Sequence, residues 1–175
     1  MTRFFIIGAF VLLSSFAAVD LYTIQFPDSA GRIVNMNSFK GKRIIVAVIN
    51  AKSPDVSYLK YLNQLQSKSD SIQVIAVPST EFAGLFDPSK IDQLKTSSKI
   101  SILLAKPSEL KKSAKSNQHP LMAWLTDKEQ NKHFDEDIDV TEKLYFINGS
   151  GVLYAILDIF ATPETITKTL QQTIR

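Results

Sequence analysis

The sequence predicts an α/β fold in which a mixed central sheet carries helices on both faces. Residues 44–49 form an unbroken, mostly β-branched apolar run, which is typical of a strand buried on both faces. A second such run, 72–77, begins roughly twenty residues later, far enough for the helical crossover of a right-handed βαβ unit. Near the C-terminus, 144–147 and 152–159 flank an Asn-Gly-Ser-Gly turn and predict a β-hairpin.

The first helix is predicted to start at Ser53-Pro54-Asp55, directly after the first strand. Ser53 is suited to cap the helix, Pro54 to occupy its first position, and Asp55 to lie in its first turn. An apolar stripe follows at helical spacing: Leu59, Leu62 and Leu65. The loop between the first strand of a βαβ unit and its helix is the usual location of chemistry. Ser53 is therefore the first candidate functional residue.

Shorter signals predict the elements around this unit. Residues 21–26 and 33–34 flank a Pro-Asp-Ser-Ala-Gly turn and predict an N-terminal β-hairpin. We expect a short helix from 87 to 96, a strand at 100–105, and a solvated basic helical turn at 108–115.

The remaining elements are two helices and a surface loop. His119-Pro120 opens a helix, with His119 in a structural role near Trp124. The highly charged stretch 127–139 has no apolar run and predicts a surface loop. Thr162-Pro163-Glu164 caps the last helix, whose apolar face is Ile166, Leu170 and Ile174.

Composition excludes several classes of function. The chain has 175 residues, 45% of them hydrophobic, and a formal net charge of +3. The densest basic group is only Lys111, Lys112 and Lys115, so a nucleic-acid partner is not expected. With no cysteine and only two histidines, the sequence predicts no disulfide, thiolate catalysis, iron–sulfur cluster or multi-histidine metal site. The acidic residues of 135–139 lack the spacing of a calcium loop, so no metal or cofactor is predicted.

Residues 1–18 predict a secretory signal peptide, followed by one domain over 19–175. Arg3 supplies the positive start and 4–16 the apolar segment. Ser15-Phe16-Ala17 has small residues at the positions that cleavage needs, and cleavage is expected after Ala17 or Ala18. The expected location is the periplasm or the exterior, with membrane contact only during export. An uncleaved N-terminal membrane anchor is the alternative.

The order hairpin, βαβ, helical insertion, hairpin, helix is that of a thioredoxin-like sandwich, and the residues resemble the glutathione peroxidase family from 21 to 174. The resemblance rests on the following residues: Leu21-Tyr22, Phe39-Lys40-Gly41-Lys42, Pro78, Phe82, Gly84, Pro120-Leu121, Trp124-Leu125 and Ile147-Asn148-Gly149-Ser150-Gly151.

The resemblance implies a peroxidatic cysteine or selenocysteine at the helix N-terminus, surrounded by glutamine, tryptophan and asparagine. The cysteine position falls on Ser53 and the glutamine position on Glu81. The tryptophan and asparagine positions fall on Val140 and Thr141, or, one residue earlier, on Asp139 and Val140. All four differ from the family pattern, and this identifies the chain as a member lacking the peroxidatic cysteine.

The replacements remove the residues on which thiol chemistry depends. A serine hydroxyl is not ionised near neutral pH, and no Gly-x-Ser-x-Gly elbow surrounds Ser53. A carboxylate at Glu81 would raise the pKa of a neighbouring anionic nucleophile. The sequence therefore predicts a non-catalytic binding or accessory module of the envelope. A protein or small-molecule partner is expected at the cleft over Ser53 and Glu81. The alternative is a peroxidase or related oxidoreductase acting in the response to oxidative stress.

Overall fold

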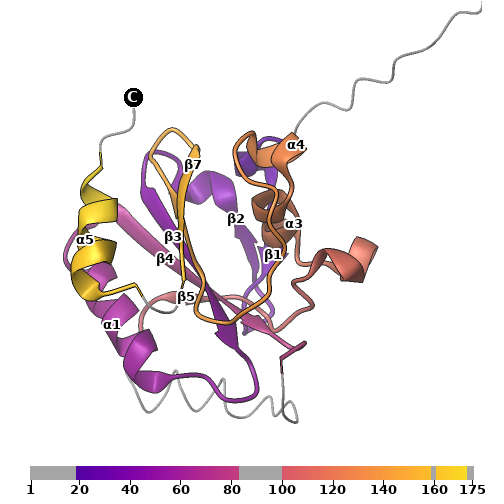
Figure 1. Cartoon of the computed structure of the whole chain (residues 1–175), viewed down its shortest axis with the longest axis horizontal. Helices are drawn as coiled ribbons and strands as arrows, with labels where there is room; N and C mark the ends of the chain where they lie inside the picture. Colours follow the sequence, from indigo (N-terminus) through magenta and orange to yellow (C-terminus); the bar gives the residue numbers. More distant parts are fainter. Residues whose placement is uncertain (1–18, 83–99, 159–160, 173–175) are drawn as a thin grey trace, which may run out of the picture.

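The computed structural model describes residues 19–82, 100–158 and 161–172. Its centre is a five-stranded mixed sheet in the order β5-β4-β3-β6-β7 (Figure 1). The strands are β3 (Arg43–Asn50), β4 (Ile72–Ser79), β5 (Leu103–Leu104), β6 (Leu144–Ile147) and β7 (Leu153–Leu157). β3 runs parallel to β4 and antiparallel to β6, and β6 and β7 form the predicted C-terminal hairpin.

β3 is the central strand, and its apolar run divides between two cores. Every residue from 44 to 49 is at most 1% exposed. Because successive side chains point to opposite faces, Ile44, Val46 and Val48 enter one core and Ile45, Ala47 and Ile49 the other. The continuous apolar pattern therefore reflects helices or loops on both sides of the sheet, as the sequence predicted.

Two helices cover the face of the sheet that carries Ile45, Ala47 and Ile49. α1 (Val56–Ser67) buries its leucine stripe there, and α5 (Pro163–Gln171) adds Ile166 and Leu170. The Thr162 hydroxyl caps α5 by accepting a hydrogen bond from the Thr165 N–H, as predicted. Ile174 lies outside the described residues.

The opposite face is covered by α3 (Pro120–Thr126) and the N-terminal hairpin. This hairpin, β1 (Gln25–Pro27) and β2 (Ile33–Asn35), is a separate two-stranded sheet (Figure 1). Two short 3-10 helices flank it, η1 (Leu21–Thr23) and η2 (Met36–Phe39). The strand predicted at 21–26 therefore begins instead as a 3-10 turn, which the Asp20 carboxylate caps through the Tyr22 N–H.

Three other expectations differ from the structure or lie outside it. The strand expected at 100–105 is reduced to β5, and the basic turn lies at η3 (Lys112–Asn117). The helix expected at 87–96 falls outside the described residues. Within the described ranges, no helix is long and apolar enough to cross a membrane.

The stretch 127–139 is not simply the surface loop that its charge predicted. It contains α4 (Lys128–Asn131) and two buried residues, Asn131 and Ile138. The Asn131 amide donates to the carbonyl oxygens of Trp124, Leu125 and Phe134 and accepts from the N–H groups of His133 and Phe134. One buried polar side chain thus organises a segment that lacks an apolar run.

Candidate functional site

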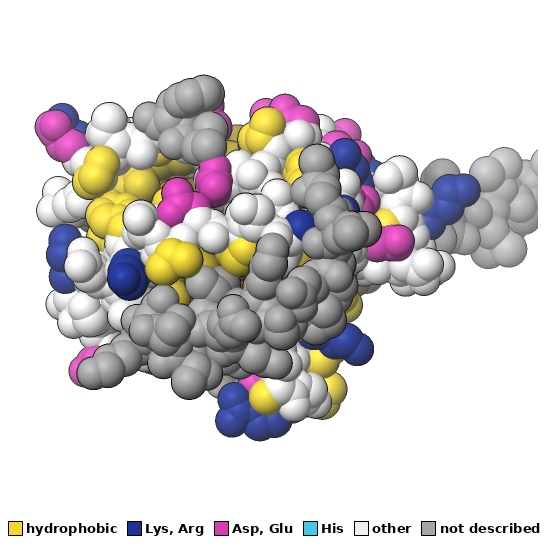
Figure 2. All heavy atoms as spheres, turned by 90° about the horizontal axis from the view of Figure 1, so that it is seen from below, with side chains coloured by type: hydrophobic (Ala, Val, Ile, Leu, Met, Phe, Trp, Pro, Cys, Tyr) yellow, Lys and Arg dark blue, Asp and Glu magenta, His cyan; other side chains and the backbone are white. Residues whose placement is uncertain are grey.

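The predicted site positions gather at the edge of the sheet where β3 and β4 end. Asn50 lies opposite Ser79 in the register, and the Ala51 N–H donates to the Ser79 carbonyl at 3.0 Å. On the other side of β3, the Glu142 N–H donates to the Val48 carbonyl at 2.6 Å and extends the pairing with β6. The segments that carry residues 53, 81 and 140–141 therefore meet at one edge. Figure 2, which views this end of the molecule, shows acidic and hydrophobic side chains next to one another.

Ser53 is exposed and does not cap α1, so that prediction is wrong. The cap is Asp55, whose Oδ1 accepts from the N–H groups of Ser57 (2.7 Å) and Tyr58 (3.1 Å). Ser53 belongs to a turn closed by the Asn50 side chain, which accepts from the Ser53 N–H at 3.3 Å. A carboxylate that satisfies two helix N–H groups and complements the helix dipole is a strong cap, and this explains why the helix begins after Asp55.

Replacing Asp55 with alanine is expected to cost about 1 kcal/mol of stability, because two N–H groups of the first turn lose their acceptor. The melting temperature should fall by roughly 2–4 °C. The matched control is Ser53→Ala, which should leave the melting temperature unchanged. The reverse order of effects in thermal denaturation would restore Ser53 as the cap.

Glu81 is half-buried, and its carboxylate accepts hydrogen bonds from backbone N–H groups. Its Oε2 accepts from the N–H groups of Leu110 at 2.6 Å and Lys111 at 3.0 Å. Its own N–H donates to the Ser79 hydroxyl at 3.2 Å. The carboxylate thus fastens the 108–111 segment beside the end of β4.

The carboxylates of Asp55 and Glu142 lie at the N-terminus of α1, and the sequence prediction did not include Glu142. Burial, and then the charge of Asp55, raise the pKa of Glu142. The Tyr58 hydroxyl donates to the Glu142 carbonyl at 3.1 Å, and burial, followed by the charge of Glu142, raises the pKa of Tyr58. The negative charges of these two carboxylates oppose an anionic nucleophile beside them.

Val140 and Thr141 supply neither an indole nor an amide. Val140 is 39% exposed and lines a cavity of about 370 Å³ with Lys143 and Ile156. In the alternative register, Asp139 occupies the tryptophan position, and its carboxylate accepts from the Lys143 ammonium at 3.1 Å. Neither register places an indole N–H or a side-chain amide at the edge. Over the described part of the chain, no group of three or more His, Cys, Asp or Glu residues could hold a metal ion.

Solved structures share this fold over most of their length. Trgpx in its apo form has a TM-score of 0.67 at 17% identity, with 88% of this chain and 94% of that chain covered. GPX1 of T. cruzi has a TM-score of 0.66 at 16% identity, with 87% and 94% covered. A secreted disulfide oxidoreductase of Mycobacterium tuberculosis, homologous to E. coli DsbE, has a TM-score of 0.53 at 8% identity, with 81% and 87% covered.

These similarities confirm the predicted fold. The chain has the thioredoxin-like fold of glutathione peroxidase-type structures, without a cysteine. No protein-family model matches the sequence, and neither does any curated protein.

Proposed function

We propose that the chain is an exported, glutathione-peroxidase-like protein that has lost peroxidase chemistry and acts as a binding or accessory module. One observation carries the proposal. The helix N-terminus, where the resemblance places the reactive cysteine, bears the exposed Ser53 in a chain that has no cysteine.

The surroundings of Ser53 support a non-catalytic role. A thiol reduces peroxide through its thiolate, which positive charge or neutral donors stabilise. Here Asp55 and Glu142 place negative charge at the same helix terminus, and each raises the free energy of an anion beside it. Glu81, at the expected glutamine position, has its carboxylate engaged by backbone N–H groups.

The same edge offers a surface for a partner. Ser53 and Asp55 are exposed, and two apolar side chains near them, Val56 (37%) and Val140 (39%), are also exposed. A contiguous exposed apolar patch rimmed by polar groups marks a binding surface, and these two valines contribute apolar area to this edge. We place the partner, a protein or a small molecule, over this edge.

The proposed export rests on the sequence. The apolar segment 4–16 is followed closely by the first element of the domain, η1 at Leu21. A signal peptide cleaved near Ala18 would leave all described elements intact.

The purified protein is expected to reduce no hydrogen peroxide above the buffer rate with glutathione or thioredoxin as reductant. Ser53→Cys should form at most a slow thiol peroxidase, because Asp55 and Glu142 disfavour its thiolate. The matched control is Ser53→Ala, which should equal the wild type. Turnover by the wild type, assayed by peroxide consumption in metal-free buffer, would support the alternative oxidoreductase function instead.

A further inference from the structure

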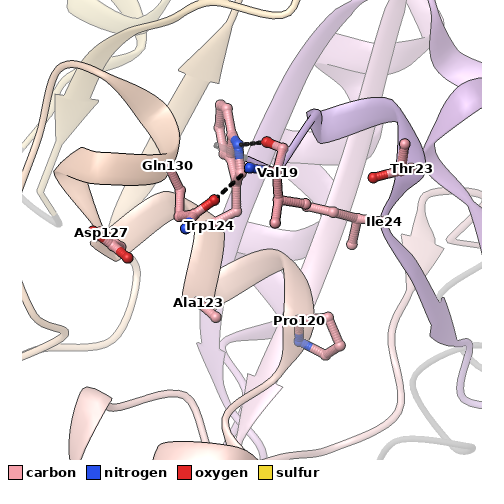
Figure 3. A pocket seen from close by; sticks show the side chains of 8 residues that line it. All are labelled: Val19, Thr23, Ile24, Pro120, Ala123, Trp124, Asp127 and Gln130. Atoms are coloured by element: carbon pink, nitrogen blue, oxygen red, sulfur yellow. Dashed lines mark hydrogen bonds between the residues drawn. The ribbon is translucent and has the colours of Figure 1, made fainter. Parts of the chain in front are cut away.

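A cavity of about 400 Å³ lies between the start of the described chain, η1 and the α3–α4 pair (Figure 3). Its lining residues are distant from Ser53 in the sequence, and the proposed function does not involve this cavity. Eight residues line it: Val19, Thr23, Ile24, Pro120, Ala123, Trp124, Asp127 and Gln130. The lining is mainly apolar, and Asp127 supplies the only charged side chain among the described residues that line it.

Val19 is held in this cavity by both of its backbone polar groups. Its N–H donates to Gln130 Oε1 at 2.6 Å, and its carbonyl accepts from the Trp124 indole Nε1–H at 3.0 Å (Figure 3). Val19 is 47% exposed as a residue, so burial does not explain this placement. One donor and one acceptor matched to the backbone of a single residue are the features of a site that recognises a chain end or an extended peptide.

The two side chains that bind the Val19 backbone belong to α3 and α4, which a hydrogen bond links to each other. The Asn131 amide, next to Gln130, donates to the backbone carbonyl of Trp124 at 3.1 Å. A second cavity, of about 220 Å³, also has Val19, Trp124 and Gln130 in its lining. Val19 therefore borders both cavities.

We propose that this cavity binds the α-amino group of the processed chain, with Val19 as the first residue. The inference rests on the proposed export. Hydrolysis of the Ala18–Val19 peptide bond by a processing peptidase gives the new carboxyl group to Ala18 and the new amino group to Val19. The resulting ammonium keeps Gln130 Oε1 as its acceptor, and Asp127 supplies negative charge in the same cavity. Cleavage after Ala17 would instead leave an amide at this position.

The first measurement is the intact mass of the protein purified from the exported fraction of a secreting host. We expect a chain that begins at Val19. A chain that begins at Ala18 would overturn this inference and leave the export proposal standing. A full-length chain from Met1 would overturn both.

The second measurement is the rate at which an amine-reactive acylating reagent modifies the Val19 amino group at pH 7, followed by peptide mapping. A hydrogen-bonded ammonium that shares its cavity with a carboxylate has its pKa raised, so its free amine is scarcer at pH 7. Gln130→Leu should therefore be labelled several-fold faster than the wild type. Glu129→Gln, a change on the same short helix that leaves Gln130 in place, should be labelled at the wild-type rate.

Trp124 is the only tryptophan, so its fluorescence reports on this site alone. In Gln130→Leu the emission should shift to the red, because loss of the Val19 contact opens the indole to water. Equal labelling rates and unchanged emission in Gln130→Leu, with the fold intact by circular dichroism, would overturn the inference.

Discussion

Replacing Asn131 with alanine is expected to destabilise the protein by about 3–5 kcal/mol, the cost of leaving several buried backbone groups without partners. Asn131 is 4% exposed and makes five hydrogen bonds to backbone groups. They link the end of α3 to residues 133–134. Each hydrogen bond contributes about 1 kcal/mol net to stability. A buried backbone group left without a partner costs more, and the segment can relax only in part.

Thermal and denaturant unfolding measure this effect, and the melting temperature should fall by roughly 10 °C. The matched control is Asn35→Ala, the same chemical change at an exposed position. The Asn35 side chain caps η2 through one hydrogen bond, so this variant should lose about 1 kcal/mol at most. An Asn131→Ala variant within 1 kcal/mol of the wild type would show that water or a rearranged loop replaces the network.

Acidification from pH 7 to pH 4 is expected to remove about 3 kcal/mol of stability through His119 alone. Burial lowers the pKa of His119 to about 4, whereas an unfolded histidine titrates near 6.5. The unfolded chain therefore binds a proton that the folded chain does not, and stability is lost as pH falls below 6.5. The ring packs against Phe26 with 4.8 Å between centroids, and within the described part of the chain neither ring nitrogen has a hydrogen-bond partner.

His119→Leu isolates this contribution, because a buried apolar side chain of similar size takes no proton. Its melting temperature should fall less between pH 7 and pH 4 than that of the wild type, by roughly 10 °C. Asp139, whose pKa the Lys143 ammonium lowers, titrates in both proteins and cancels in the comparison. Parallel melting curves for the two proteins over this range would rule out His119 as the acid-sensitive group.

The sheet could be predicted from the sequence because its signals are long and local. The apolar runs of β3 and β4 and the turn between β6 and β7 each specify one element without reference to the rest of the chain. Thr162-Pro163 at the start of α5 is equally local, and the structure confirms its cap.

The candidate site was less predictable because it depends on contacts between distant residues. Serine and aspartate both favour the N-cap position, so Ser53 and Asp55 are equally good candidates from sequence. Only the turn that the Asn50 side chain closes places Asp55 at the N-cap. Glu142 lies beside Tyr58 because β6 pairs with β3, a register that no local pattern specifies. Likewise, Asn131 in a charged segment gives no sign of burial until α3 and the following loop close around it.

The pairing of β3 on its two sides has a consequence for the order of folding. On one side β3 meets β4, which follows within the next 30 residues; on the other it meets β6, about one hundred residues later. During synthesis, one backbone edge of the most apolar strand therefore stays open until almost the whole chain exists. Such long-range pairing slows folding, and an open apolar edge can pair with another chain. The central strand is thus the first strand of the five-stranded sheet to be made and among the last to be completed.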